Sequence, residues 1–442
     1  MQLYLHNTLC SRQKRGICTY RAMPFFIFII LSMVVSKAQE QQILHTLFSC
    51  YESMKIGKTN KISIIEFDMH KEQEIMKLYH ELITNTYVLS PYTCFLIYDP
   101  IPREIFAPHV RDRIVHHFIY REIEPILEQL FLKNSYACRK WKWTHYGVFD
   151  IKKMMRSASD NYTKEARICK NDIFSFFMSI NKDILFALIE DILWNNEAML
   201  TYPKDRLSTI IKTIIYHDPT SNYVRIGKHI DRKSFPPHKS LFASKPWTGL
   251  PLGNLTSQLF ANIYLHELDI FITKTLGIEH YGRYMDDFVM IHTDKTFLLD
   301  SIQKIKIFLE EKLKLILHPH KKYFQPIHHG VLFCWVHIKP YYMIPRTRTI
   351  GRWKKKIYEW IHSPPKSYSQ REQFRSTINS YLGMMKHWHS YRLRKNMLWL
   401  LPTSRHNHIY FKQPFDKIML KLKKIKKKYT QTLFILYKLF WW

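Results

Sequence analysis

Glycine is unusually scarce in this chain. It occurs 11 times among 442 residues, whereas average usage of about 7% would give roughly 31 glycines. Tryptophan, which is normally rare, also occurs 11 times. Few glycines are therefore available for the turns and close backbone approaches that need a residue without a Cβ atom.

Acidic residues are also few. The chain has 36 Asp and Glu against 67 Lys and Arg, which gives a formal net charge of +31. Such a charge predicts a polyanionic partner, either nucleic acid or an anionic membrane surface. An AT-rich genome that inflates lysine usage is an alternative source of the excess, so charge alone selects no function. The apolar fraction of 46% argues against global disorder.

Paired cysteines are absent. The 7 cysteines are scattered and odd in number, and no Cys-X-X-Cys sequence occurs. This pattern argues against a disulfide framework or a zinc site. The histidines include no His-Glu-X-X-His sequence either. We therefore expect reduced thiols and a cytoplasmic protein.

Long apolar runs are rare. The run from Pro24 to Ser36 follows a basic stretch and resembles the hydrophobic region of a signal peptide. It is too short for a comfortable transmembrane helix. We interpret residues 1–42 as an N-terminal extension, from a mis-set start codon or a peripheral segment, in preference to an export signal. No stable membrane partner is expected.

Helix and strand signals are mixed along the chain without regular βαβ alternation, which predicts an α+β fold. A further helix is predicted after Asn181, a good N-cap residue. Helical periodicity covers residues 41–53, 72–84, 110–131, 255–276, 297–315, 353–361 and 371–393. Strands are predicted over 167–173, 281–292 (strand, turn, strand), 331–338 and 341–344.

Two adjacent carboxylates, Asp286 and Asp287, lie between apolar strand segments. Aspartate disfavours strands, and neighbouring carboxylates raise each other's pKa. Such a pair is tolerated at a solvent-exposed turn or beside cations. A third carboxylate, Asp172, ends the predicted strand from Arg167. Because Mg2+ prefers carboxylate oxygens, the three aspartates predict a two-metal site for nucleotidyl transfer.

The residues around these aspartates resemble the motifs of reverse transcriptases. The sequence YGRYMDD is similar to motif C, and KNDIFSFFMSINKDIL from Lys170 is similar to motif A. The stretch GLPLGNLTSQLFANIYLHELD resembles motif B, but it has LGNLTSQ where most members have QGxxxSP. That variant resembles the reverse transcriptases of diversity-generating retroelements, within the bacterial group II intron and retron-like superfamily. Blocks that resemble the finger segments precede motif A, and blocks that resemble motif D, motif E and the thumb follow motif C in order. The resemblance therefore covers roughly residues 43 to 400.

The resemblance implies a right-hand polymerase with fingers, palm and thumb. Its implied divisions are an extension (1–42), fingers (43–171), palm (172–345, with a finger insertion at about 195–245), thumb (346–411) and a basic C-terminal tail (412–442). The implied activity is RNA-directed DNA synthesis that copies a template-repeat RNA, with errors at adenines. Alternatives are a retron-like or defence-associated bacterial reverse transcriptase, and a non-catalytic nucleic-acid-binding protein with a decayed site.

The resemblance also implies cofactors and partners. Mg2+, with Mn2+ as an alternative, would be held by Asp172, Asp286 and the backbone carbonyl of Ile173, with Asp287 in support. Lys321 matches a motif D lysine that protonates pyrophosphate, although neighbouring Lys322 leaves the register open. The implied partners are an RNA template, a DNA or RNA primer, deoxynucleoside triphosphates and a small basic accessory variability protein.

Further residues match nucleotide-binding positions of the family. Phe177 would stack on the incoming sugar and exclude a 2′-hydroxyl, with core packing as the alternative. Arg103 and Arg139 would meet the triphosphate, because a guanidinium binds phosphate with two parallel hydrogen bonds. Gly253 would allow a close backbone approach at the start of motif B, and Gln258 would sense the templating base pair.

Tryptophan stands where the family pattern has glycine at positions 141, 143, 247 and 335. Turns at such positions favour a residue that adopts positive φ without strain. One explanation is that UGA encodes glycine in the source lineage and has been read as tryptophan. The alternative is drift in a degenerating element, which would distort the loop from Arg139 to Thr144.

Overall fold

The computed structural model describes residues 25–98, 102–227, 235–321, 323–364, 367–401, 409–412 and 415–420. Residues 1–24, which make up most of the predicted extension, lie outside these ranges. So does the lysine-rich tail after residue 420. Within them, no helix combines the length and the apolar character that a membrane crossing requires.

The N-terminal region packs helices against a small sheet. The long helix α5 buries one face, including Ile114 and Phe118, because its apolar residues recur at three- and four-residue spacing. The strands of the sheet run in the order β2-β1-β4, and β4 pairs parallel with β1. The elements are α2 (Phe25–Lys55), α3 (Ile62–Asp68), α4 (Lys71–Ile83), β1 (Tyr92–Ile97), β2 (Arg103–Ala107), α5 (Val110–Leu130) and β4 (Tyr223–Arg225).

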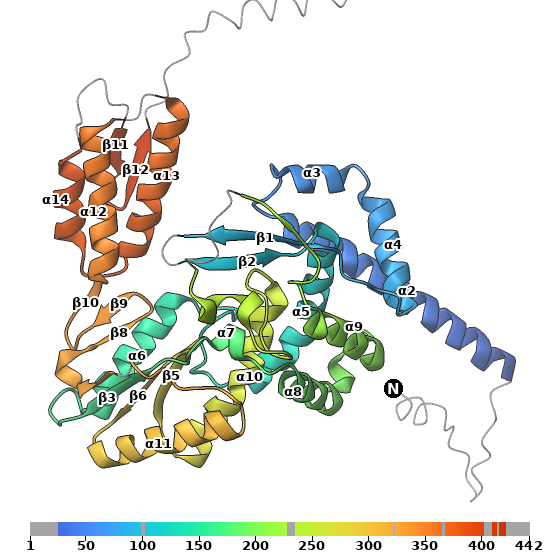
Figure 1. Cartoon of the computed structure of the whole chain (residues 1–442), viewed down its shortest axis with the longest axis horizontal. Helices are drawn as coiled ribbons and strands as arrows, with labels where there is room; N and C mark the ends of the chain where they lie inside the picture. Colours follow the sequence, from blue (N-terminus) through green and yellow to red (C-terminus); the bar gives the residue numbers. More distant parts are fainter. Residues whose placement is uncertain are drawn as a thin grey trace, which may run out of the picture.

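A four-stranded antiparallel sheet of order β5-β6-β3-β7 forms the centre of the molecule. Alternate residues of β6 point to opposite faces, as the period of a strand requires. Phe288 and Met290 join the larger core, whereas Val289 and Ile291 join a second core with α6. Figure 1 shows α6 and α11 on opposite sides of this sheet. The strands are β3 (Arg167–Asn171), β5 (His280–Tyr284), β6 (Asp287–His292) and β7 (Tyr323–Pro326).

Helices cover both faces of the central sheet. Helix α10 is almost entirely buried between α5 and α8, and this explains why it has no distinct polar face. Helix α11 begins after Asp294, whose side chain accepts hydrogen bonds from the backbone N–H groups of Thr296 and Phe297. The helices of this central part of the chain are α6 (Thr144–Ala158), α7 (Phe176–Ser179), α8 (Lys182–Asn195), α9 (Lys204–Tyr216), α10 (Leu255–Ile270) and α11 (Lys295–Glu311).

The C-terminal part is a helical lobe that Figure 1 shows set apart from the N-terminal helices. Its separate core contains Trp353, Trp360 and Leu382. A small sheet of β8, β9 and β10 precedes it. The elements are β8 (Val331–Phe333), β9 (Val336–Ile338), β10 (Met343–Pro345), α12 (Thr347–His362), α13 (Tyr368–Met385), α14 (Tyr391–Trp399), β11 (Ile409–Lys412) and β12 (Lys417–Leu420).

The predicted α+β class is confirmed, because the structure mixes helices with antiparallel sheets. Two elements that were predicted to be continuous are interrupted in the structure. The helix expected over 371–393 is broken after Met385, where the backbone N–H of His389 donates to the Met343 carbonyl. The strand expected over 331–338 folds into a hairpin, because Cys334 and Trp335 both have positive φ.

Candidate active site

The three predicted aspartates meet at one end of the central sheet. Asp172 directly follows β3, Asp286 lies in the β5–β6 turn, and Asp287 is the first residue of β6. In the register of these strands, Tyr284 pairs with Asp287, and Asn171 of β3 pairs with Phe288 of β6. The end of β3 is therefore adjacent to the turn. The sheet brings together carboxylates that are far apart in the sequence.

The turn between β5 and β6 is tight. Met285 has a φ of 55°, a left-handed conformation that is uncommon for residues other than glycine. The backbone that directly follows Asp172 is also fixed, in this case by hydrogen bonds. The backbone N–H of His318 donates to the Asp172 carbonyl at 2.8 Å, and that of Phe174 donates to Ile316 at 2.8 Å. Ile173 is thus held between two backbone hydrogen bonds.

Negative charge accumulates at this end of the sheet. Burial raises the pKa of Asp286 to about 7, and the charges of Asp172 and Asp287 add to the increase. Burial also raises the pKa of Asp287, although the neighbouring Lys170 ammonium opposes that shift. An added cation would therefore be favoured here.

Two lysines partly supply that positive charge. Lys170 Nζ lies 2.9 Å from an Asp287 oxygen, and Lys321 Nζ lies 2.8 Å from an Asp172 oxygen. The predicted Lys321 thus reaches the aspartates, whereas Lys322 lies outside the described residues. Lys170 was missed by the sequence analysis. Its signal is the two-residue spacing from Asp172, which places both side chains on one face when the strand continues.

The donor set fits a hard divalent cation in its chemistry. Carboxylate oxygens are the ligands that Mg2+ prefers, and such an ion would offset the burial and the repulsion that together raise the pKa of Asp286. Among the described residues, no three His, Cys, Asp or Glu side chains are already gathered around an ion-sized position. Asp172 and Asp287 are instead each turned to a lysine.

Phe177 lies on the short helix α7, five residues after the first aspartate. It is partly buried, whereas neighbouring Phe176 is buried in the core, and the two rings are 5.4 Å apart. The Phe177 carbonyl accepts from the backbone N–H of Leu250 at 2.8 Å, which joins α7 to the segment ahead of α10. The partial exposure of Phe177 is compatible with both predicted roles, so the sugar gate stays a prediction.

Gly253 and Gln258 lie at the start of α10. Gly253 has a φ of +118°, and an added Cβ would lie 2.9 Å from Ile105 and 3.0 Å from the Phe106 carbonyl oxygen. The close approach that this glycine permits is therefore to β2. Gln258 is exposed, and its side-chain oxygen lies 3.2 Å from the Cys138 thiol that donates to it.

The two predicted triphosphate arginines differ in their environment. Arg103 is exposed at the start of β2. Arg139 is buried, and its guanidinium donates to both carboxylate oxygens of Glu128, at 3.0 and 2.9 Å. Its remaining donors reach the carbonyls of Glu128, Leu132 and Ser135. A phosphate contact by Arg139 would require this set of bonds to open.

Comparisons with known proteins agree with these features. A family model described as "Reverse transcriptase (RNA-dependent DNA polymerase)" matches residues 101–328. Protein YkfC of Escherichia coli (strain K12) is similar, with 22% identity over 296 residues that cover 59% of this chain and 70% of that protein.

Solved telomerase structures are also similar. An apo telomerase from Candida Tropicalis, truncated from its C-terminal domain, has 15% identity and a TM-score of 0.42, covering 61% of this chain and 59% of that chain. Telomerase from Candida albicans in complex with a fragment of telomeric RNA has 12% identity and a TM-score of 0.43, covering 71% and 55%. This chain therefore spans less than two thirds of the length of these telomerase chains.

Proposed function

Because the chain belongs to the reverse transcriptase (RNA-dependent DNA polymerase) family, we propose that it extends a primer 3′ end with deoxynucleotides on an RNA template. The mixed fold with its antiparallel central sheet is the one expected of a right-hand polymerase of this family. The observation that carries the proposal is the meeting of Asp172 with Asp286 and Asp287 at one end of that sheet.

In this proposal, Asp172, Asp286 and the carbonyl of Ile173 hold Mg2+, with Mn2+ as an alternative, and Asp287 supports them. When bound, the metal supplies positive charge that activates the primer hydroxyl and stabilises the departing pyrophosphate. The backbone bonds of Asp172 and Phe174 support the role of Ile173, since they fix its peptide group. Lys170 favours the ionised form of Asp287.

Lys321 is proposed to have two roles. Its ammonium pairs with Asp172, so it is within reach of the proposed metal site. It can hold Asp172 before substrate binds and then donate a proton to pyrophosphate. Because 57% of its side chain is exposed, Lys321 can move between these positions at little cost in packing.

The nucleotide would be recognised around this centre. Phe177 is proposed to exclude the 2′-hydroxyl, Arg103 and Arg139 to bind the triphosphate, and Gln258 to monitor the templating base. Gly253 keeps the start of α10 against β2. The exposure of Arg103 and Gln258 supports their assignments, and the partial exposure of Phe177 is compatible with its role.

The finer proposal is a reverse transcriptase of a diversity-generating retroelement. The LGNLTSQ sequence at the start of motif B supports it. The enzyme would then copy a template-repeat RNA with errors at adenines, together with a small basic accessory protein. The genomic neighbourhood tests this: a nearby pair of near-identical DNA segments that differ at adenines is expected, and its absence would contradict the subtype.

The activity itself is tested by primer extension. The purified full chain is incubated with an RNA template, an annealed DNA primer, deoxynucleotides and Mg2+, and the products are separated by length. Template-length DNA is the expected product, and chelation with EDTA should abolish it. Binding of the primed template without extension would instead identify a non-catalytic nucleic-acid-binding protein.

A further inference from the structure

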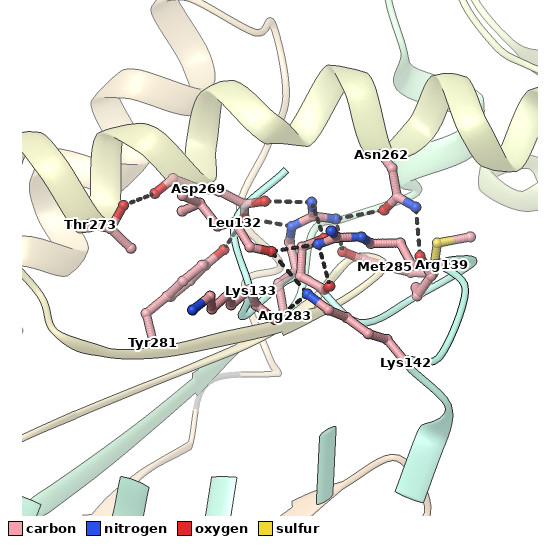
Figure 2. A network of polar contacts seen from close by, with 12 residues as sticks. Leu132, Lys133, Arg139, Lys142, Asn262, Asp269, Thr273, Tyr281, Arg283 and Met285 are labelled. Carbon is pink, nitrogen blue, oxygen red and sulfur yellow. Dashed lines mark hydrogen bonds and ion pairs between the residues drawn. The ribbon is translucent and has the colours of Figure 1, made fainter. Parts of the chain in front are cut away.

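A buried ion pair lies directly beneath the catalytic turn. Arg283 is one residue before the Tyr-Met-Asp-Asp sequence, and its side chain and that of Asp269 on α10 are both 0% exposed. Arg283 Nε and Nη2 donate to the two oxygens of Asp269, each at 2.6 Å. Tyr281 donates its hydroxyl to the same carboxylate. Figure 2 shows the pair between α10 and the turn.

The remaining donors of Arg283 reach three further segments. Nη1 donates to the backbone carbonyl of Met285 and to the side-chain oxygen of Asn262, both at 3.1 Å. Nη2 also donates to the Ser135 hydroxyl at 3.1 Å. A guanidinium has five N–H groups in a rigid fork, so this arrangement uses all of its donors.

The backbone of Arg283 joins the same segments. Its N–H donates to the Asn134 carbonyl at 2.8 Å, and its carbonyl accepts from the N–H of Tyr136 at 2.9 Å. Residues 134–136 therefore run along the free edge of β5. Asn262 completes the connection, because its amide donates to the Ala137 carbonyl at 2.8 Å.

The Met285 turn needs such support. A left-handed residue with a side chain stores strain, and it persists only where its surroundings hold it. A buried ion pair is weak evidence for stability, because desolvation offsets much of its attraction. The pair matters here because it fixes the position of the Arg283 guanidinium, which donates to the carbonyl of Met285, the residue directly before Asp286.

We infer that Arg283 is a positioning residue, which holds the Met285 turn so that Asp286 and Asp287 face Asp172. Through Ser135 and Asn262 it also sets the place of the loop from Asn134 and of α10 relative to that turn. The inference deepens the proposed function and rests on it for its catalytic consequence. The structural part, that the turn depends on Arg283, stands independently of any activity.

The test compares Arg283→Lys with Arg111→Lys in the full chain. Lysine keeps the charge of Arg283 but has no fork, so it cannot bind Asp269 and the Met285 carbonyl together. Arg111 is a matched control, because it makes a comparable two-pronged pair with Glu81 on α4. Each protein is first studied without metal by hydrogen–deuterium exchange of the peptide that spans residues 280–292.

We expect exchange in this peptide to be about 10-fold faster in Arg283→Lys and unchanged in Arg111→Lys, because loss of the fork frees the turn to open locally. In primer extension, Arg283→Lys should lower kcat by about 100-fold, since small misplacements of reacting groups have effects of this size. The half-saturating Mg2+ concentration should rise, with the nucleotide KM nearly unchanged.

Unchanged exchange in Arg283→Lys, or a rate loss no larger than its loss of folded protein, would overturn the inference. If this variant does not fold, Ser135→Ala decides, because it removes a single partner of Nη2. Roughly 3-fold faster exchange would then support the inference, and no change would overturn it. If the wild-type chain lacks polymerase activity, the proposed function fails, while the exchange comparison still decides the role of Arg283.

Discussion

Tryptophans 141, 247 and 335 have backbone conformations that disfavour a side chain. Their φ angles are 63°, 60° and 65°, in a region where an L-residue with a Cβ is strained by about 1 kcal/mol or more. Their exposed fractions are 80%, 64% and 48%, so little indole is buried in return. Trp143 differs, because its φ of −78° suits any residue. The prediction that the backbone needs a residue with positive φ is therefore wrong at position 143.

Glycine at position 141 should stabilise the fold. Trp141→Gly is expected to raise the free energy of unfolding by about 1 kcal/mol, because glycine adopts positive φ without strain. Trp194→Gly is the matched control: this tryptophan is 72% exposed but lies in α8, where glycine should cost about 1 kcal/mol. Urea unfolding measures both. A loss of stability in Trp141→Gly would show that the backbone at position 141 does not favour glycine. UGG codons at 141, 143, 247 and 335 would eliminate codon reassignment.

Phe177 allows a test of sugar selection at a single side chain. Phe177→Ala is expected to increase ribonucleotide incorporation relative to deoxynucleotides by about 10-fold or more, because the ring would no longer exclude the 2′-hydroxyl. A competition assay with both nucleotides measures the ratio. Phe176→Leu, in the core beside it, should leave the ratio unchanged. The same ratio in Phe177→Ala and the wild type would assign Phe177 to the core.

At the scale of single residues, the sequence located the aspartates better than their partners. Asp172, Asp286 and Asp287 could be named because each motif is a short stretch of chain. The only sequence signal of Lys170 is its two-residue spacing from Asp172, and Arg283 has none. The contacts that give them importance, with Asp287 and with Asp269, exist only once the strands and α10 have folded. The same holds for the pairing of Arg139 with Glu128.

Among the elements, strong periodicity and clear caps predicted best. The β5–β6 hairpin and α5 lie where the alternation and the 3–4 spacing placed them. The first strands, β1 and β2, were missed because short strands between prolines give no periodic signal. The break between α13 and α14 was missed for a different reason: local periodicity continues through 386–390, but a tertiary contact between His389 and Met343 ends the helix.

The packing of α5 on α10 predicts how the stability of the fold depends on pH. His116 is fully buried against Thr256, and burial lowers its pKa from 6.5 to about 3. Its Nε2 atom has no hydrogen-bond partner among the described residues. Because the unfolded chain takes up the proton more readily, stability should fall as the pH drops below about 6.5, by up to 1.4 kcal/mol per pH unit.

Asparagine at position 116 should remove this dependence. His116→Asn is expected to flatten the decline in the free energy of unfolding between about pH 6 and pH 4, because the neutral amide does not titrate. Urea unfolding at several pH values measures the slope. His70→Asn is the control, since His70 is exposed. An identical slope in His116→Asn and the wild type would show that His116 is not protonated on unfolding in this range.

For the whole molecule, we expect the excess of positive charge to govern nucleic-acid binding. With a net charge of +31, RNA affinity should fall steeply with salt, because each neutralised phosphate releases counterions. We expect a plot of log affinity against log salt concentration with a slope of about −3 or steeper for single-stranded RNA. Fluorescence anisotropy at several KCl concentrations measures it. Salt-independent binding would contradict an electrostatic interface.

The central claim is that RNA-templated DNA synthesis takes place at the aspartate cluster. The most direct measurement is Mg2+-dependent primer extension on RNA by the wild type and by Asp286→Asn, with RNA affinity measured in parallel. We expect extension by the wild type only and nearly equal RNA affinity for both proteins, since catalysis needs the carboxylate whereas binding rests mainly on Lys and Arg. Robust Mg2+-dependent synthesis by Asp286→Asn would contradict it.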